Sequence, residues 1–119
     1  MSAAVEQTGR VMRTDVCGVE QVAPESGVTA LVEGTPVAVF RTHDDRWFAL
    51  ANYDPFSRAS VLARGIVGTR GDRDVVASPM HKQAFDLATG QCLDDEAVTV
   101  PTYDVTIDRG RVLVGRRTG

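Results

Sequence analysis

The stretch ASPMHKQAFDLATGQC, residues 77–92, carries the clearest structural signals in the sequence. It overlaps the end of the β-branched segment Asp74–Ser78 and contains a second strand-like segment, Gln83–Leu87. Between them, Pro79–Lys82 is short enough for a compact loop, so the two segments are predicted to form a pair of strands. Thr89-Gly90 supplies the residue types of the next turn. The stretch therefore predicts β structure around a loop that begins at a serine and contains a histidine.

The rest of the chain repeats this pattern of short apolar segments between turn residues, and no segment has a sustained helical period. Ala59–Arg64 has the composition of a single helical turn, and Asn52–Arg73 is a long connection of the kind that often carries function. The other predicted strands are Thr14–Val19, Val28–Glu33, Pro36–Thr42, Arg46–Ala51, Val98–Val100, Tyr103–Asp108 and Arg111–Arg116. We therefore predict an all-β domain of about nine or ten short strands in an antiparallel sandwich or barrel.

The stretch at 77–92 resembles the second cluster-binding loop of Rieske proteins, in which Cys-Pro-x-His precedes Phe-Asp-Leu-x-Thr-Gly. The proline, His81 and the whole of Phe-Asp-Leu-Ala-Thr-Gly are present, but Ser78 stands where the cysteine belongs. The first loop of that family, Cys-x-His, corresponds to Asn52-Tyr53-Asp54. The resemblance implies a Rieske-like [2Fe-2S] fold, which we assign to residues 12–117. Residues 1–11 are expected to be a flexible lead-in.

The four degenerate cluster-ligand positions are Asn52, Asp54, Ser78 and His81. A Rieske centre needs two thiolates on one iron and two imidazoles on the other. Only His81 keeps the required side chain, and the other three offer hard oxygen atoms where iron bound to sulphide favours soft sulphur donors. We therefore expect this chain to bind neither a cluster nor another metal or cofactor.

The substitutions themselves form a pattern, made of NYDPFS (52–57), VLARGI (61–66) and SPMHKQAFDL (78–87). This combination resembles the small subunit of assimilatory NAD(P)H-dependent nitrite reductase. The resemblance implies a non-redox accessory subunit of a cytoplasmic enzyme that reduces nitrite to ammonia in nitrate assimilation. It also implies that FAD, iron–sulphur centres and sirohaem reside on a large subunit, and that this chain has no catalytic residues of its own. The alternative is a Rieske-type ferredoxin that carries electrons to an oxygenase, which the missing ligands disfavour.

Composition agrees with one folded core, because the 119 residues are 43% apolar and 24% charged. A net charge of −3 disfavours a nucleic-acid or anionic-membrane partner. Met1–Arg10 has no apolar run of signal-peptide length, and no run of about eighteen apolar residues occurs, so we expect a cytoplasmic protein. The two cysteines, Cys17 and Cys92, are interpreted as buried structural thiols.

Several residues invite other interpretations, which we rank lower. His43-Asp44-Asp45 has metal-ligand residue types but the composition of a turn. Asp54 and Asp86 could be a carboxylate pair, although Asp86 is better explained as the cap of the Thr89-Gly90 turn. Ser78 beside His81 suggests a nucleophile, but no oxyanion-hole or third-member signal accompanies them. A small-molecule or nucleic-acid binding barrel is the remaining alternative.

We predict that two loops, Asn52–Ile66 and Pro79–Gln83, come together and form the docking face for the large subunit. The predicted apolar centre is Phe56, Met80 and the stem of Lys82, and the predicted polar rim is Arg58, Arg64 and the Lys82 ammonium group. Phe56 follows a proline in the long loop, so it either fills the space left by the cluster or faces the partner. The residues leave both alternatives open.

Overall fold

The computed structural model describes residues 13–119, and most of this part of the chain is β structure. It contains eleven strands and two short 3-10 helices, η1 (Val19–Gln21) and η2 (Leu62–Arg64), and no α-helix. The predicted all-β class is confirmed, with slightly more strands than expected. The predicted lead-in at residues 1–11 lies outside the described residues. Within residues 13–119 no helix reaches the length and apolarity needed to cross a membrane.

The largest element is a six-stranded antiparallel sheet with the order β1-β11-β10-β4-β3-β2. Its two edge strands, β1 and β2, approach each other, so the sheet curls almost into a closed barrel. Its strands are β1 (Thr14–Gly18), β2 (Ser26–Val32), β3 (Thr35–Arg41), β4 (Trp47–Ala51), β10 (Thr102–Asp108) and β11 (Arg111–Arg117).

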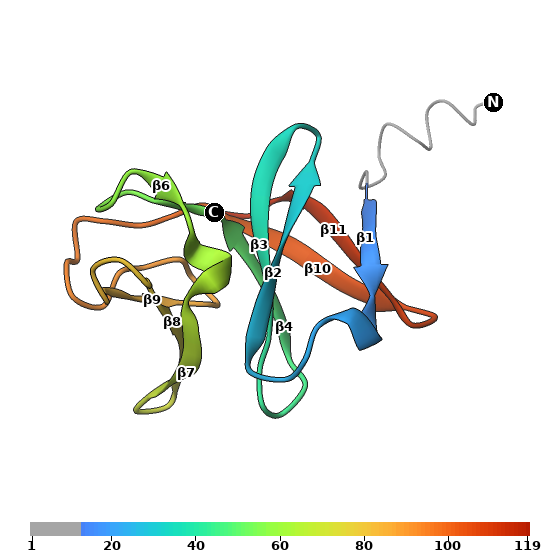
Figure 1. The fold of residues 1–119 in the computed structure, drawn as a ribbon, viewed down its shortest axis with the longest axis horizontal. Helices are drawn as coiled ribbons and strands as arrows, with labels where there is room; N and C mark the ends of the chain where they lie inside the picture. Colours follow the sequence, from blue (N-terminus) through green and yellow to red (C-terminus); the bar gives the residue numbers. More distant parts are fainter. Residues whose placement is uncertain (1–12) are drawn as a thin grey trace.

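Two smaller sheets lie beside β2 and β3, at the left in Figure 1. One pairs β5 (Tyr53–Asp54) with β6 (Ala59–Ser60), and the other has the order β7-β8-β9. The strands of the second are β7 (Ile66–Arg70), β8 (Arg73–Ala77) and β9 (Ala84–Asp86). The long connection predicted at 52–73 is therefore not irregular, because it contains β5, β6, η2 and β7.

Strand β3 joins the large and small sheets because both of its faces are buried. Val37 and Val39 point into a core cluster inside the six-stranded sheet, whereas Ala38 and Phe40 belong to a second cluster shared with the small sheets. Successive side chains of a strand point to opposite faces, so a continuous apolar run fits a strand covered on both sides. The second cluster, which includes Leu62, underlies the segments that carry the degenerate ligand positions.

Two local predictions are corrected by the structure. The composition of Asp108-Arg109-Gly110 predicts a three-residue hairpin loop, but in the structure Asp108 pairs with Arg111. The loop has two residues, Arg109 and Gly110, with φ of 53° and 78°, as the type I′ turn that suits the twist of a hairpin requires. The strand predicted at Val98–Val100 is reduced to an isolated bridge between Thr99 and Gln91.

Candidate functional site

The two loops that carry the degenerate ligand positions meet through a pair of buried side chains. The Ser78 hydroxyl, at the end of β8, donates a hydrogen bond of 2.5 Å to Oδ2 of Asp54 in β5. Asp54 is fully buried and Ser78 is almost so. These two residues are 24 positions apart in the sequence, so the contact closes one loop against the other.

Asp54 accepts further hydrogen bonds within its own loop. The backbone N–H of Phe56 donates to Oδ1 at 2.9 Å, and the Ser57 hydroxyl donates to Oδ2 at 3.0 Å. Burial raises the pKa of the Asp54 carboxyl, but the hydrogen bonds from Ser78, Phe56 and Ser57 lower it by more, so the net pKa lies below the ordinary value. The group at this position is therefore an ionised carboxylate at neutral pH.

Ser78 organises the second loop in the same way. Its backbone N–H donates to the carbonyl of Gln83 at 2.9 Å, and its carbonyl accepts from the N–H of Lys82 at 3.0 Å. Its hydroxyl oxygen also accepts from the N–H of Met80 at 3.2 Å. The hydroxyl is almost fully buried and pairs with Asp54, whereas His81 is exposed, so the geometry does not support the Ser78–His81 nucleophile interpretation.

Asn52 fastens the base of the first loop. Its side-chain Oδ1 accepts from the N–H of Ala63 at 2.8 Å, and its backbone carbonyl accepts from the N–H of Leu62 at 3.0 Å. Its own backbone N–H donates to the carbonyl of Pro36 in β3 at 3.1 Å. These bonds hold η2 against the large sheet, so Asn52 is a buried structural residue in this position.

The side chains at the four ligand positions do not fit a [2Fe-2S] cluster. Asn52 and Asp54 use their oxygens in protein hydrogen bonds, Ser78 supplies a hydroxyl, and His81 is exposed. Neither cysteine stands at one of these positions, because Cys92 belongs to the core cluster shared with the small sheets and Cys17 lies in β1. Among residues 13–119, no three His, Cys, Asp or Glu side chains are gathered to hold a metal ion. The donor set is therefore wrong for iron bound to sulphide.

Phe56 points inward rather than away from the domain. It is partly buried and packs against the core cluster, with its ring centroid 6.1 Å from that of Phe85 and the rings tilted by 49°. Of the two alternatives left open by the sequence, this geometry favours a side chain that fills space between the loop and the core. Met80, Lys82, Arg58 and Arg64 are exposed.

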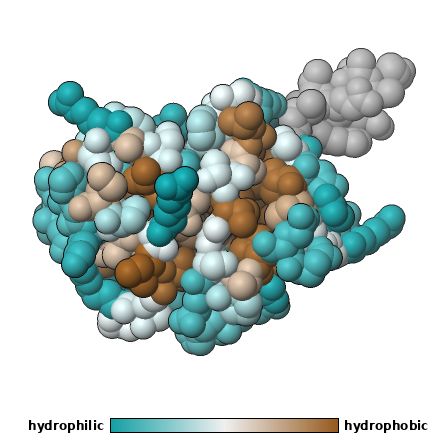
Figure 2. Space-filling model, viewed as in Figure 1, coloured by the Kyte–Doolittle hydropathy of each residue, from teal (hydrophilic) through white to brown (hydrophobic). Residues whose placement is uncertain are grey.

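Two exposed apolar side chains of these loops, Tyr53 (47% exposed) and Ile66 (75%), were not among the residues predicted for the docking face. Together with the predicted Met80 (57%), they are three of the five large hydrophobic residues exposed among residues 13–119. On the face shown in Figure 2, hydrophobic residues form several patches over β2 and over the small sheets to its left, with hydrophilic and neutral residues between and around them. The sequence signal that could have revealed the outward direction of Tyr53 is its place next to Asp54, because neighbouring residues of a strand point to opposite faces and Asp54 stands at an inward-facing ligand position.

The exposed charges of the two loops are all positive. Arg58, Arg64 and Lys82 are exposed, whereas the only acidic residue of Asn52–Ile66 and Pro79–Gln83 is the buried Asp54. This contrasts with the chain as a whole, whose net charge is −3. The two loops therefore combine exposed apolar side chains with a local excess of cations.

The other sequence candidates have structural explanations. Asp86 accepts hydrogen bonds from the N–H groups of Ala88 and Thr89 and pairs with Arg73, which confirms its role as a turn cap. In the turn after β3, Asp44 accepts from the Thr42 hydroxyl and from Arg46. Neither carboxylate shares a hydrogen-bond partner with Asp54.

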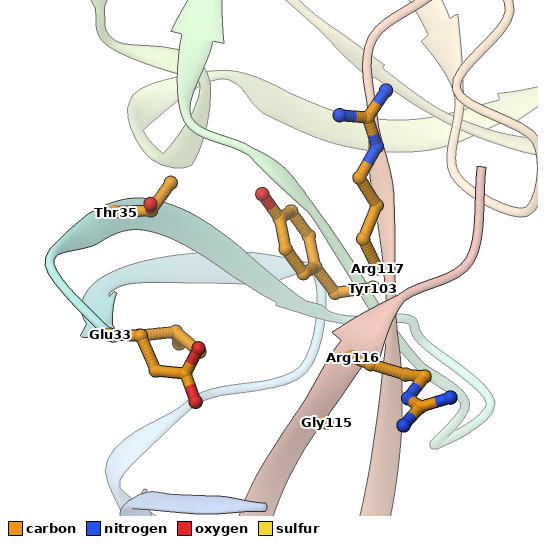
Figure 3. Close-up of a pocket in the computed structure, with 7 residues that line it drawn as sticks. Glu33, Thr35, Tyr103, Gly115, Arg116 and Arg117 are labelled. Carbon is orange, nitrogen blue, oxygen red and sulfur yellow. The ribbon is translucent and has the colours of Figure 1, made fainter. Parts of the chain in front are cut away.

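A surface hollow of about 330 Å³ lies between the β2–β3 turn and the ends of β10 and β11. Its lining includes Glu33, Tyr103, Arg116 and Arg117, none of which belongs to the two loops. Figure 3 shows the two arginines pointing to different sides of β11, and Nε of Arg117 donates to the carbonyl of Gly119 at 2.6 Å. The hollow has no convergent set of acid, base and nucleophile.

Comparison with known proteins identifies relatives along most of the chain. The model of the Rieske-like [2Fe-2S] domain matches residues 13–115. The nitrite reductase (NADH) small subunit of Escherichia coli K12 is 41% identical over 99 residues, which cover 82% of this chain and 92% of the relative. A crystal structure assigned to the NADH-dependent nitrite reductase small subunit of Mycobacterium tuberculosis superposes with a TM-score of 0.87 at 44% identity, covering 92% and 99% of the two chains.

A further relative is part of a longer protein. The nitrite reductase [NAD(P)H] large subunit of Klebsiella oxytoca is 32% identical over 102 residues, which are 86% of this chain but 11% of the relative. The same domain is thus present within that large-subunit polypeptide. From the matched domain, the identity along most of both chains and the shared fold, we conclude that this chain belongs to the family of small subunits of NAD(P)H-dependent nitrite reductases, built on a Rieske-like domain.

Proposed function

We propose that the chain is the non-redox small subunit of a cytoplasmic nitrite reductase that serves nitrate assimilation, and that it binds no cluster of its own. In this proposal the FAD, iron–sulphur centres and sirohaem are carried by the large subunit, and the chain acts by binding to that subunit. The observation that carries the proposal is the replacement of a cluster donor set by buried, hydrogen-bonded Asn52, Asp54 and Ser78 in a member of this family.

The relative from Klebsiella supports the choice of partner. A domain that is a separate chain in one organism and part of a longer chain in another is expected to contact the rest of that longer chain in both cases. The relevant longer chain is named as a nitrite reductase large subunit. The partner proposed for this chain is therefore the corresponding large subunit.

We place the docking face on the loops Asn52–Ile66 and Pro79–Gln83. Met80, Tyr53 and Ile66 provide exposed apolar area, which is what the centre of an interface needs. Arg58, Arg64 and Lys82 provide cations in two loops that contain no exposed acid, so they suit an acidic surface on the large subunit. Phe56 supports this face from beneath by packing on Phe85.

A binding experiment with single alanine variants tests this face. Met80→Ala and Lys82→Ala should each weaken binding to the purified holo large subunit by at least about fivefold, with thermal stability retained. Matched controls are Ile107→Ala and Arg109→Ala, because both residues are exposed near the β10–β11 turn, at the opposite end of the molecule in Figure 1. Affinity should also fall as salt rises, since exposed charge pairs are screened. Unchanged affinity in both loop variants would refute the placement, and failure of the wild-type chain to bind would refute the partner.

The ferredoxin alternative makes an opposite prediction about colour. An electron carrier of the Rieske type would contain iron and sulphide and absorb visible light, whereas the proposed subunit is colourless. Only His81 could serve as a cluster ligand at the four positions, and a single imidazole cannot hold a [2Fe-2S] cluster.

A further inference from the structure

The Asp54 carboxylate is the point at which the two loops of the proposed docking face are joined. It accepts hydrogen bonds from Phe56 and Ser57 within its own loop, and from Ser78 of the other loop. Ser78 in turn binds the N–H groups of Met80 and Lys82. A continuous chain of hydrogen bonds therefore runs from one loop, through a single buried carboxylate, to the backbone that presents two exposed side chains.

The cost of this arrangement indicates that the charge has a specific use. A buried carboxylate is unfavourable unless its hydrogen bonds replace those of water, and Asp54 has three donors within 3.0 Å and no exposed surface. A neutral turn residue would close the first loop without this cost. What the carboxylate adds is a strong acceptor for the hydroxyl of Ser78 in the other loop.

The backbone of the second loop needs such support. Lys82 has a φ of 65°, a left-handed conformation that is uncommon for a residue with a side chain. The loop is closed by the two backbone hydrogen bonds of Ser78, to Gln83 and from Lys82. If Ser78 were free to turn, the acceptor of the Met80 N–H would move as well.

From these contacts we infer that Asp54 is a positioning residue, which orders the Met80–Lys82 segment for docking by holding Ser78 in place. It thereby links the two loops at the position where the fold family places a metal cluster. The docking half of this inference rests on the function proposed above, whereas the link between the loops does not.

Amide hydrogen exchange on the isolated, isotope-labelled chain tests the link directly. Asp54→Asn keeps the size of the side chain but replaces the carboxylate, the acceptor of the Ser78 hydroxyl, by an amide with only one accepting oxygen. Ser78→Ala removes the hydroxyl, which is both the donor to Asp54 and the acceptor of the Met80 N–H. We expect the amides of Met80 and Lys82 to exchange at least about tenfold faster in both variants. The matched control is Asp86→Asn, which alters another buried, hydrogen-bonded carboxylate in β9. It should destabilise the fold without selectively accelerating exchange in the 80–82 segment.

The second measurement is the affinity of the same variants for the holo large subunit, at a temperature where all of them are folded. Asp54→Asn and Ser78→Ala should weaken binding by at least about fivefold, and Asp86→Asn should not. If the amides of Met80 and Lys82 exchange in both variants at the same rate as in the wild-type chain, the inference is overturned. Faster exchange with unchanged affinity would overturn the positioning role while leaving the link in place. If the wild-type chain itself does not bind, the proposed function fails, and the exchange result still decides the link.

Discussion

Replacing Phe56 by alanine should destabilise the domain more than it disturbs any exposed surface. The ring is partly buried and packs on Phe85 with a centroid distance of 6.1 Å. Complete burial of a phenylalanine makes its truncation cost about 3–5 kcal/mol, and an aromatic pair contributes about 0.5–1.5 kcal/mol of its own. For a ring that is only partly buried, we expect Phe56→Ala to lower the free energy of unfolding by about 2 kcal/mol.

The assay is thermal unfolding followed by circular dichroism, supported by urea titration. A loss of this size should lower Tm by roughly 8–15 °C in a domain of about 100 residues. Met80→Ala is the matched comparison, because Met80 is 57% exposed and its truncation should change stability by less than about 0.5 kcal/mol. The reasoning is refuted if Phe56→Ala keeps the wild-type Tm and loses affinity for the large subunit, because Phe56 would then face the partner rather than the core.

Three other predictions concern the iron content, the acid stability and the thiol reactivity of the chain. Freshly isolated protein should contain no iron or acid-labile sulphide, because the positions at 52, 54 and 78 supply neither thiolates nor a second imidazole, and near-stoichiometric iron would contradict this. Because the pKa of Asp54 is lower in the folded than in the unfolded chain, its contribution to stability is complete above about pH 4 and is lost as the pH falls through the folded pKa. Asp44 and Asp94 contribute in the same way, because hydrogen bonds from the Thr42 hydroxyl and the Ala84 N–H lower their respective pKa values. The loss of stability specific to Asp54 is therefore obtained by comparing wild type with Asp54→Asn in urea titrations from pH 7 to pH 2.5. An equal loss of unfolding free energy in the two proteins would contradict the prediction. In native protein without reductant, Cys92 should resist alkylation because it is fully buried. Cys17 is only partly buried and burial raises the pKa of its thiol, so it should react slowly at alkaline pH. Peptide mass mapping distinguishes the two cysteines.

Much of the fold could be predicted from local sequence because local rules dominate there. The apolar run in β3, the place (though not the length) of the glycine-containing turn at 109–110, and the Phe-Asp-Leu-Ala-Thr-Gly segment all depend on alternation, burial or positive φ, which are properties of a few neighbouring residues. The cap at Asp86 is of the same kind, because the two backbone N–H groups that donate to its carboxylate lie two and three residues further along the chain. The loss of cluster ligands is also evident from residue types, since a carboxylate, an amide and a hydroxyl are not thiolates at any distance.

The direction of each side chain in the candidate site depended on contacts between distant segments. Whether Phe56 faces inward is decided by Phe85, which lies 29 positions away in another sheet. Asp54 is a structural link rather than a surface charge because Ser78 of the other loop donates a hydrogen bond to it. Tyr53 is exposed because the neighbouring Asp54 side chain points into the domain. Sequence alone determined the family, the β architecture and the unsuitability of the ligand positions, because these follow from residue type and local spacing. Tertiary structure decided which of the same residues fill the core, join the loops or face solvent, because burial and long-range hydrogen bonds exist only once the sheets have packed together.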